Sequence, residues 1–209
     1  AGRAALDRMV ARLVPPQGLV EPVTVTVADD PTINAFAVPG GQVILYRGLI
    51  NQARSPEEVA GVLAHEFGHV QRYHANQALI RHFGLGIFIE GLGGDIGSLA
   101  STGLFLTHTR TAEREADEEA ARFLRRSGIS SSGLANFFSR MGGYSLAGGG
   151  KGDEKGSAAN PGREVVDLLS THPPDRERQR FFAQSARSYA STPVLSPAEW
   201  KALQEICSS

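Results

Sequence analysis

The chain has 209 residues, of which 41% are hydrophobic, and its formal net charge at pH 7 is −1. This length and apolar content suffice for a sizeable core, and we expect a single domain over residues 1–209. The near-neutral charge argues against a nucleic-acid partner, because binding to phosphates requires an excess of Lys and Arg. The single cysteine, Cys207, excludes an internal disulfide framework and a zinc cluster built from cysteines.

Hydrophobic periodicity predicts two helices and three strands before residue 54. The helices are Ala4–Val14 and Gly48–Ala53, and the strands are Glu21–Ala28, Ile33–Val38 and Gln42–Arg47. Pro39-Gly40-Gly41 separates the last two strands and indicates a tight turn. We expect a small sheet over residues 21–47 that packs on the helix that follows it.

That helix has a strong start signal and carries a chemical motif. Ser55 suits the N-cap, Pro56 suits the first helical position, and Glu58 completes a capping box, while the helix is expected to end near Asn76. His65 and His69 are four residues apart, so both rings project from one face, and Glu66 lies beside them. This HExxH arrangement is typical of zinc hydrolases, with the glutamate as the base.

Residues 84–106 are apolar and long enough to raise the question of a membrane span. Glu90, Asp95 and seven glycines argue against a stable spanning helix. Two interpretations remain open for this segment. It is either a buried or partly mobile connection packed near the active site, or a segment that acts as a lid or makes peripheral contact with a membrane.

A hydrolytic zinc site needs three protein ligands and one open position for water. The helix predicted over Thr109–Arg126 carries Glu113 and Asp117 four residues apart on one face. One carboxylate can bind the metal, and the other can accept a hydrogen bond from a ligating histidine. These residues alone do not decide which carboxylate has which role.

Other polar residues near these motifs have no motif of their own. We interpret three acidic residues as solvated helix charges, namely Glu115, Glu118 and Glu119. Three histidines are interpreted as ordinary surface or core residues, namely His74, His82 and His108. Further along, a Gly-rich stretch at about 142–163 predicts a flexible loop, and helices are expected within about 175–207, the last capped by Ser196 and Glu199.

Several motifs in one order resemble the CAAX-prenyl-protease/HtpX-type zinc metallopeptidases. They are NAFAVPGG (Asn34–Gly41), SPEE (Ser55–Glu58), HEFGH, TRTAEREAD (Thr109–Asp117) and STHPPDRER (Ser170–Arg178). The resemblance implies an α+β, α-rich zincin-like fold and one Zn²⁺ per chain held by His65, His69 and Glu113. It also implies that Asp117 supports the ligands and that His172 and Arg178 lie at the active-site rim.

The mechanism follows as a hypothesis. Glu66 takes a proton from the attacking water, and His172 and Arg178 stabilise the developing oxyanion. Because His172 follows a flexible stretch, it could instead occupy the fourth zinc position and hold the enzyme latent. We expect the strand Gly41–Arg47 to be a sheet edge, to which an unfolded polypeptide substrate adds through main-chain hydrogen bonds.

The location and biological role are also expectations. The chain begins at Ala1 without an initiator Met or an apolar leader, which suggests a trimmed form that has lost its signal segment. With no convincing transmembrane hairpin, it looks like the soluble exported branch of the family. This implies the envelope or periplasm and the degradation of unfolded or misfolded proteins. The alternative is a zinc-stabilised chaperone or assembly module kept non-catalytic by His172.

Overall fold

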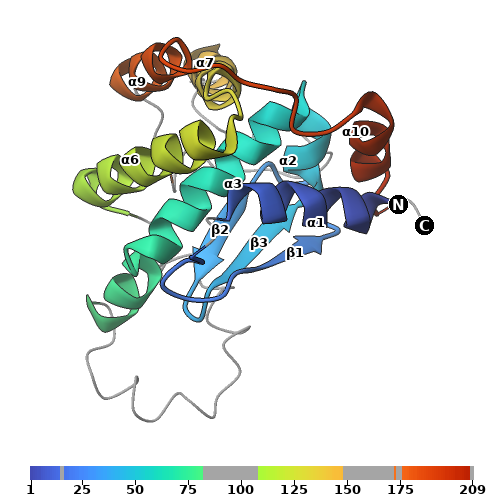
Figure 1. Cartoon of the computed structure of the whole chain (residues 1–209). Coiled ribbons are helices and arrows are strands. Elements are labelled where there is room, and N and C mark those ends of the chain that lie inside the picture. The colour runs from blue at the N-terminus through green and yellow to red at the C-terminus, as the bar shows by residue number, and fades with distance from the viewer. Residues whose placement is uncertain (15–16, 82–107, 148–171, 173–175, 208–209) are drawn as a thin grey trace, which may run out of the picture.

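A computed structural model of the chain describes residues 1–14, 17–81, 108–147, 172 and 176–207 (Figure 1). Its centre is helix α3 (Pro56–Gln71), which packs against strand β2 on one side and against helices α6 (Arg110–Ser127) and α7 (Ser132–Ala147) on the other. Helices predominate, and the described strands form one small sheet. This is the α-rich α+β architecture that the sequence predicts.

The sheet has three strands in the order β1-β3-β2. They are β1 (Thr24–Ala28), β2 (Ala35–Val38) and β3 (Gln42–Tyr46). Strand β1 is parallel to β3, and β2 is antiparallel to it. The predicted tight turn joins β2 to β3, and Gly40 and Gly41 adopt left-handed backbone angles there, with φ of 86° and 72°.

The prediction that Gly41–Arg47 forms a free sheet edge is wrong, because β3 is the central strand and is paired on both sides. The edge strand beside α3 is β2. The backbone N–H of Tyr46 donates to the carbonyl oxygen of Asn34 at 3.0 Å. In an antiparallel ladder alternate residues face opposite ways, so the backbone groups of Ala35 and Ala37 point away from β3.

Helix α3 is buried along most of its length, from Glu58 to Val70. Two glycines allow its neighbours to approach closely. A Cβ on Gly61 would lie 2.7 Å from the Cβ of Leu134 in α7, and one on Gly68 would lie 2.5 Å from the carbonyl oxygen of Ala116 in α6. Both distances are too short for a side chain, so glycine at these positions sets how near α6 and α7 lie to α3.

The start of α3 differs from the prediction in one detail. Ser55 is the N-cap and Pro56 the first residue, but the capping box with Glu58 is wrong, because the Ser55 side chain makes no capping hydrogen bond. The carboxylate of Glu58 instead binds the guanidinium of Arg140 in α7, at 2.8 and 2.6 Å. A bidentate charged pair is stronger than a cap hydrogen bond, which explains the exchange.

The end of α3 also differs, since the helix stops at Gln71 and does not continue to Asn76. Tyr73 has φ of 55°, in the left-handed region that few residues other than glycine adopt. The chain turns there, and residues 74–81 form a separate helical segment. This turn changes the direction in which His74 points, with consequences for the site.

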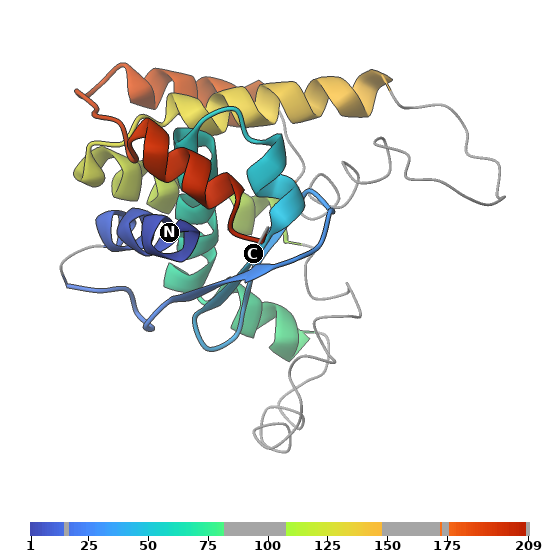
Figure 2. The same ribbon diagram turned by 90° about the vertical axis from the view of Figure 1, so that its right-hand side faces the viewer.

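The remaining helices follow the predictions within a few residues. They are α1 (Gly2–Leu13), α2 (Arg47–Gln52), α9 (Arg176–Ala186) and α10 (Pro197–Gln204). The predicted capping box of Ser196 and Glu199 is present at the start of α10. Helices α7 and α9 run side by side on the face of the molecule away from the sheet (Figure 2), and α10 packs on α1.

Two predicted segments fall partly or wholly outside the described residues. Helix α7 continues to Ala147, so the prediction of a loop from residue 142 is wrong for residues 142–147. The rest of that stretch, and all of residues 84–106, lie outside the part of the chain that the structure describes. Within the described residues, no helix combines the length and apolar character that crossing a membrane requires.

Candidate metal centre

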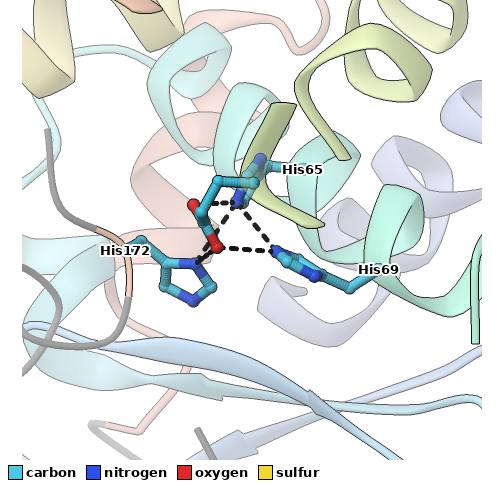
Figure 3. A group of neighbouring side chains, drawn as sticks. His65, His69 and His172 are labelled. Atoms are coloured by element: carbon cyan, nitrogen blue, oxygen red, sulfur yellow. Dashed lines mark hydrogen bonds and ion pairs between the residues drawn. The ribbon is translucent and has the colours of Figure 1, made fainter. Parts of the chain in front are cut away.

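Two histidines of α3 begin a buried cluster. The Nε2 atoms of His65 and His69 lie 3.1 Å apart, and both side chains are almost fully buried. A separation of four residues places both rings on the same side of the helix. Figure 3 shows the two rings converging on one point.

Glu113 of α6 brings a carboxylate to the same point. Its Oε2 lies 3.3 Å from Nε2 of His65, and its Oε1 lies 3.3 Å from Nε2 of His69. This contact depends on the close approach of α6 to α3 at Gly68. The glutamate is 5% exposed, so a negative charge is held in the interior beside two imidazoles.

His172 adds a fourth donor atom to the group. Its Nδ1 lies 3.3 Å from Nε2 of His65 and 3.0 Å from Oε1 of Glu113 (Figure 3). One donor atom from each of His65, His69, Glu113 and His172 lies within 4.8 Å of the others. All four side chains are buried.

The donor set fits a metal ion of the size and preference of zinc. Ligand atoms of a tetrahedral zinc site, with Zn–N distances of 2.0–2.1 Å, are about 3.3 Å from one another. The imidazole nitrogens here are 3.1 and 3.3 Å apart, close to that value. Imidazole nitrogens with one carboxylate oxygen are ligands that zinc accepts.

Asp117 and Arg178 support this donor set from outside. Oδ1 of Asp117 lies 2.9 Å from Nδ1 of His65, which fixes the orientation of that ring. Arg178 of α9 binds Asp117 through Nε at 2.6 Å and Nη2 at 2.8 Å, and its Nη1 lies 2.9 Å from Oε2 of Glu113. Its guanidinium stacks 4.5 Å from the ring of Phe138. Arg178 therefore bridges the carboxylates of Glu113 and Asp117, which both belong to α6.

Glu66 lies beside the cluster and is fully buried. Neither carboxylate oxygen makes a hydrogen bond of good geometry within the described residues, and Nε2 of His172 lies 3.5 Å from Oε1. Burial raises the pKa of Glu66, while His172, His65 and the nearby backbone of Ala37 in β2 oppose that rise. A carboxylate in this state is well suited to take a proton.

A comparison with protein families decides the assignment. The sequence model of Peptidase family M48 matches residues 2–185, a range that includes every residue of the site described so far. The chain belongs to peptidase family M48. The sequence resemblance to zinc metallopeptidases is thereby confirmed at the level of the family.

Relatives of this M48 chain are named as proteases, and several of them as metalloproteases. The chain is 27% identical over 166 residues to mitochondrial metalloendopeptidase OMA1 of Arabidopsis thaliana, covering 77% of the chain and 31% of the relative. It is 30% identical over 185 residues to the beta-barrel assembly-enhancing protease of Yersinia pestis, covering 80% and 35%. For metalloprotease YcaL of Escherichia coli K12 the identity is 27% over 172 residues, covering 77% and 61%. The chain thus spans about a third to three-fifths of these relatives.

Three residues near the M48 cluster were interpreted from the sequence as having no special role. Nδ1 of His74 lies 2.9 Å from Nδ1 of His69, and Glu115 contacts the other nitrogen of His74. The ring of His108 stacks on that of His69, with 3.9 Å between centroids. No sequence signal identified them, because His74 follows His69 at a spacing of five and is positioned by the turn at Tyr73.

The charges around the M48 metal centre favour a proton on His65 when no metal is bound. Burial alone would lower the pKa of His65, but the charge of Glu113 and hydrogen bonds to Asp117 and Glu113 outweigh it and raise that pKa to about 9. Burial would raise the pKa of Glu113, but the charges of His172 and His65 hold it far below its usual range. Burial lowers the pKa of His69 and lowers that of His108 to about 3.

Proposed function

We propose that the chain is a zinc-dependent endopeptidase that cleaves unfolded or misfolded polypeptides in protein quality control of the cell envelope. The observation that carries this proposal is the position of Glu66. Its buried carboxylate lies 3.5 Å from Nε2 of His172 and interacts electrostatically with His65 and Glu113. A purely structural zinc site has no need of such a base.

In this proposal His65, His69 and Glu113 hold the ion. Zinc bound there would supply Lewis-acid polarisation of the scissile carbonyl and of a water molecule. Glu66 takes the proton from the attacking water and returns it to the leaving amine. Asp117 keeps Nδ1 of His65 protonated, so that Nε2 faces the ion.

His172 has two candidate roles, as an oxyanion donor or as a latch. Its Nδ1 lies at the donor cluster rather than at the rim, and this supports the latch. As the fourth ligand it occupies the position that water needs in a catalytic site. We infer that the described arrangement is a latent form that opens when His172 withdraws.

For Arg178 the contacts support a positioning role more than an oxyanion role. Three of its nitrogens face Asp117 and Glu113 at hydrogen-bonding distances. A guanidinium that holds two buried carboxylates is poorly available to a substrate oxygen. We therefore propose that it fixes the ligand Glu113 and the supporting Asp117.

The substrate strand is assigned to β2 in place of the central strand β3. The backbone of Ala37 points away from β3 and lies near Glu66, so a polypeptide added at this edge would pass the base. Main-chain pairing reads few side chains, which suits unfolded chains of varied sequence. The envelope location is supported by the relative named for beta-barrel assembly.

A chaperone or assembly module with a structural zinc is the second candidate. The observation in its favour is that His172 completes a closed set of four buried donors, as structural zinc sites have. In this case His172 would never leave, and Glu66 would have no substrate to act on. The two candidates differ in turnover, not in metal content.

The deciding experiment combines metal analysis with cleavage of unfolded casein by the wild type and by the Glu66→Gln variant. We expect one zinc per chain in both proteins and a rate that is about 10²–10⁴-fold lower in the variant, the typical contribution of a general base. Glu118→Gln is the matched control, since Glu118 is an exposed acid of α6.

The outcomes separate the candidates. Zinc in both proteins with cleavage only by the wild type and the control supports the endopeptidase. Zinc in all proteins without cleavage, even in the His172→Ala background, supports the chaperone. Failure of the wild type to bind zinc would overturn both.

A further inference from the structure

A row of polar side chains extends behind His69, on the side of its ring away from the metal donors. Nδ1 of His69 lies 2.9 Å from Nδ1 of His74, and Nε2 of His74 lies 3.0 Å from Oε2 of Glu115. The His74 side chain is 2% exposed, whereas that of Glu115 is 44% exposed. The row thus connects a buried donor to a solvated carboxylate.

The protons in this row can be assigned from geometry. When Nε2 of His69 faces the ion, its Nδ1 must carry the hydrogen and donate it. Nδ1 of His74 is then the acceptor, so the hydrogen of the neutral His74 ring is on Nε2. That Nε2–H points at the Glu115 carboxylate, which accepts it. Every donor has one acceptor, and only one pair of tautomers satisfies both contacts.

We propose that His74 and Glu115 are positioning residues for the metal centre. Together they fix the Nδ1–H tautomer and the ring orientation of His69, so that its Nε2 is presented to the ion. The proposal rests on the metal site of the proposed function, and it assigns to that site two residues outside the HExxH motif.

The backbone around these residues is arranged to make the contact. Glu115 is two residues from both Glu113 and Asp117, so it leaves α6 in a different direction from those two carboxylates. It cannot reach a ligand directly and contacts His69 through His74. His74 is brought behind His69 by the left-handed turn at Tyr73. His65 is held by Asp117 directly, and His69 is held by Glu115 through this intermediate ring.

The test replaces the acceptor on His74 and then restores it. In His74→Leu the side chain has a similar size but no acceptor, whereas in His74→Asn the Oδ1 atom takes the place of Nδ1 of the ring. Zinc dissociation constants are measured by competition with a chelator at fixed pH. We expect His74→Leu to bind zinc about 10–100-fold more weakly, the usual effect of losing an outer partner. His74→Asn should recover most of this loss. The zinc affinity of Glu115→Gln should lie between those of His74→Leu and the wild type.

A spectroscopic measurement separates positioning from packing. In the zinc-loaded wild type, the proton on Nδ1 of His69 should give a downfield NMR signal. Its coupling to the ring nitrogen that carries it identifies the ring as a metal-bound histidine. We expect this signal in His74→Asn and its loss in His74→Leu. Glu118→Gln, an exposed acid on the same helix, should match the wild type in affinity and spectrum.

Specific results would overturn the proposal. Equal weakening of zinc binding in His74→Leu and His74→Asn would show that the ring acts only by filling space. Unchanged zinc affinity in His74→Leu would show that His69 needs no partner. If a variant fails to fold by circular dichroism, Glu115→Gln still tests the outer half of the row. In each case zinc binding by the wild type keeps the failure of this proposal distinct from failure of the proposed function.

Discussion

Nε2 of His172 lies 3.5 Å from Oε1 of Glu66, while Nδ1 of the same ring lies 3.0 Å from Oε1 of Glu113. One imidazole therefore stands between the proposed base and the proposed metal ligand. An attacking water and a scissile carbonyl need this same space. Under the proposed mechanism, turnover requires His172 to move away from this position.

Removal of the imidazole should activate the enzyme. We expect His172→Ala to cleave casein faster than the wild type, because the fourth position is then permanently available to water. If the open form is a minor state, populated at up to about 10%, the increase is about tenfold or more. The measurement is the initial rate at equal zinc content.

The double variant His172→Ala, Glu66→Gln controls for contaminating proteases and should be inactive. A fall in the rate of His172→Ala, with zinc retained, would contradict the latch. That result would assign His172 to the oxyanion.

The pair formed by Asp117 and Arg178 should govern metal affinity. Asp117→Asn keeps the shape of the side chain but removes the charge that orients His65, and we expect zinc affinity to fall about 10–100-fold. Arg178→Lys loses the two-pronged contact with Asp117 and should also weaken zinc binding. Competition with a chelator measures both effects.

Arg180→Lys is the control for this experiment, because Arg180 is exposed on the same helix. Unchanged zinc affinity in Arg178→Lys together with a lower kcat would instead indicate that Arg178 stabilises the oxyanion.

Much of the fold was predictable because it depends on local sequence patterns. Strand β1 alternates Val and Thr, and Thr109 and Gly128 bound α6 as its N-cap and left-handed C-cap. The order of the strands was not predictable from alternation, since it depends on which partners meet in the folded chain. The end of α3 was also missed, because Tyr73 is not a residue that usually marks a left-handed turn.

The parts of the candidate site could be predicted from the sequence to different degrees, for similar reasons. The histidine pair follows from helical spacing, but the choice of Glu113 over Asp117 needed the resemblance to a family. In the structure, Glu113 lies among the donor atoms and Oδ1 of Asp117 lies beside Nδ1 of His65. His74 and Glu115 were missed, because their contact joins a turn after one helix to the flank of another.

Gly68 should be necessary for the metal site. An alanine there gains about 0.8–1.0 kcal/mol of helix propensity, but its Cβ would meet the carbonyl oxygen of Ala116 at 2.5 Å. A backbone atom cannot rotate away, and overpacking of this kind costs about 1–3 kcal/mol. We expect Gly68→Ala to lower the unfolding midpoint and to weaken zinc binding, because α6 must shift and carries Glu113 with it. A variant with wild-type stability and affinity would show that the close approach is not required.

Zinc binding should depend on pH through His65. In the metal-free protein this ring has its pKa raised to about 9 by Glu113 and Asp117 despite its burial, so at pH 7 it carries a proton that zinc must displace. We expect affinity to increase with pH up to about 9 and about one proton to be released per zinc at pH 7. Calorimetry in buffers of different ionisation enthalpy measures that number.

The stability of the metal-free protein should show the opposite dependence over the same range. A folded-state pKa of about 9 for His65, above its ordinary 6.5, stabilises the fold fully below pH 6.5, and this contribution is lost as pH rises through 9. The lowered pKa values of Glu113 and Asp117 act in the other direction, because their contribution is present above about pH 4.5 and is lost as pH falls. Burial lowers the pKa values of His69, His74 and His108, so these rings also destabilise the fold as pH falls below about 6.5. The unfolding midpoint without zinc should therefore peak at about pH 6.5–7. His65→Gln, which cannot hold the proton, should remove the decline above pH 6.5. A wild-type midpoint that instead rises between pH 7 and 9 would show that His65 is not protonated in the metal-free site.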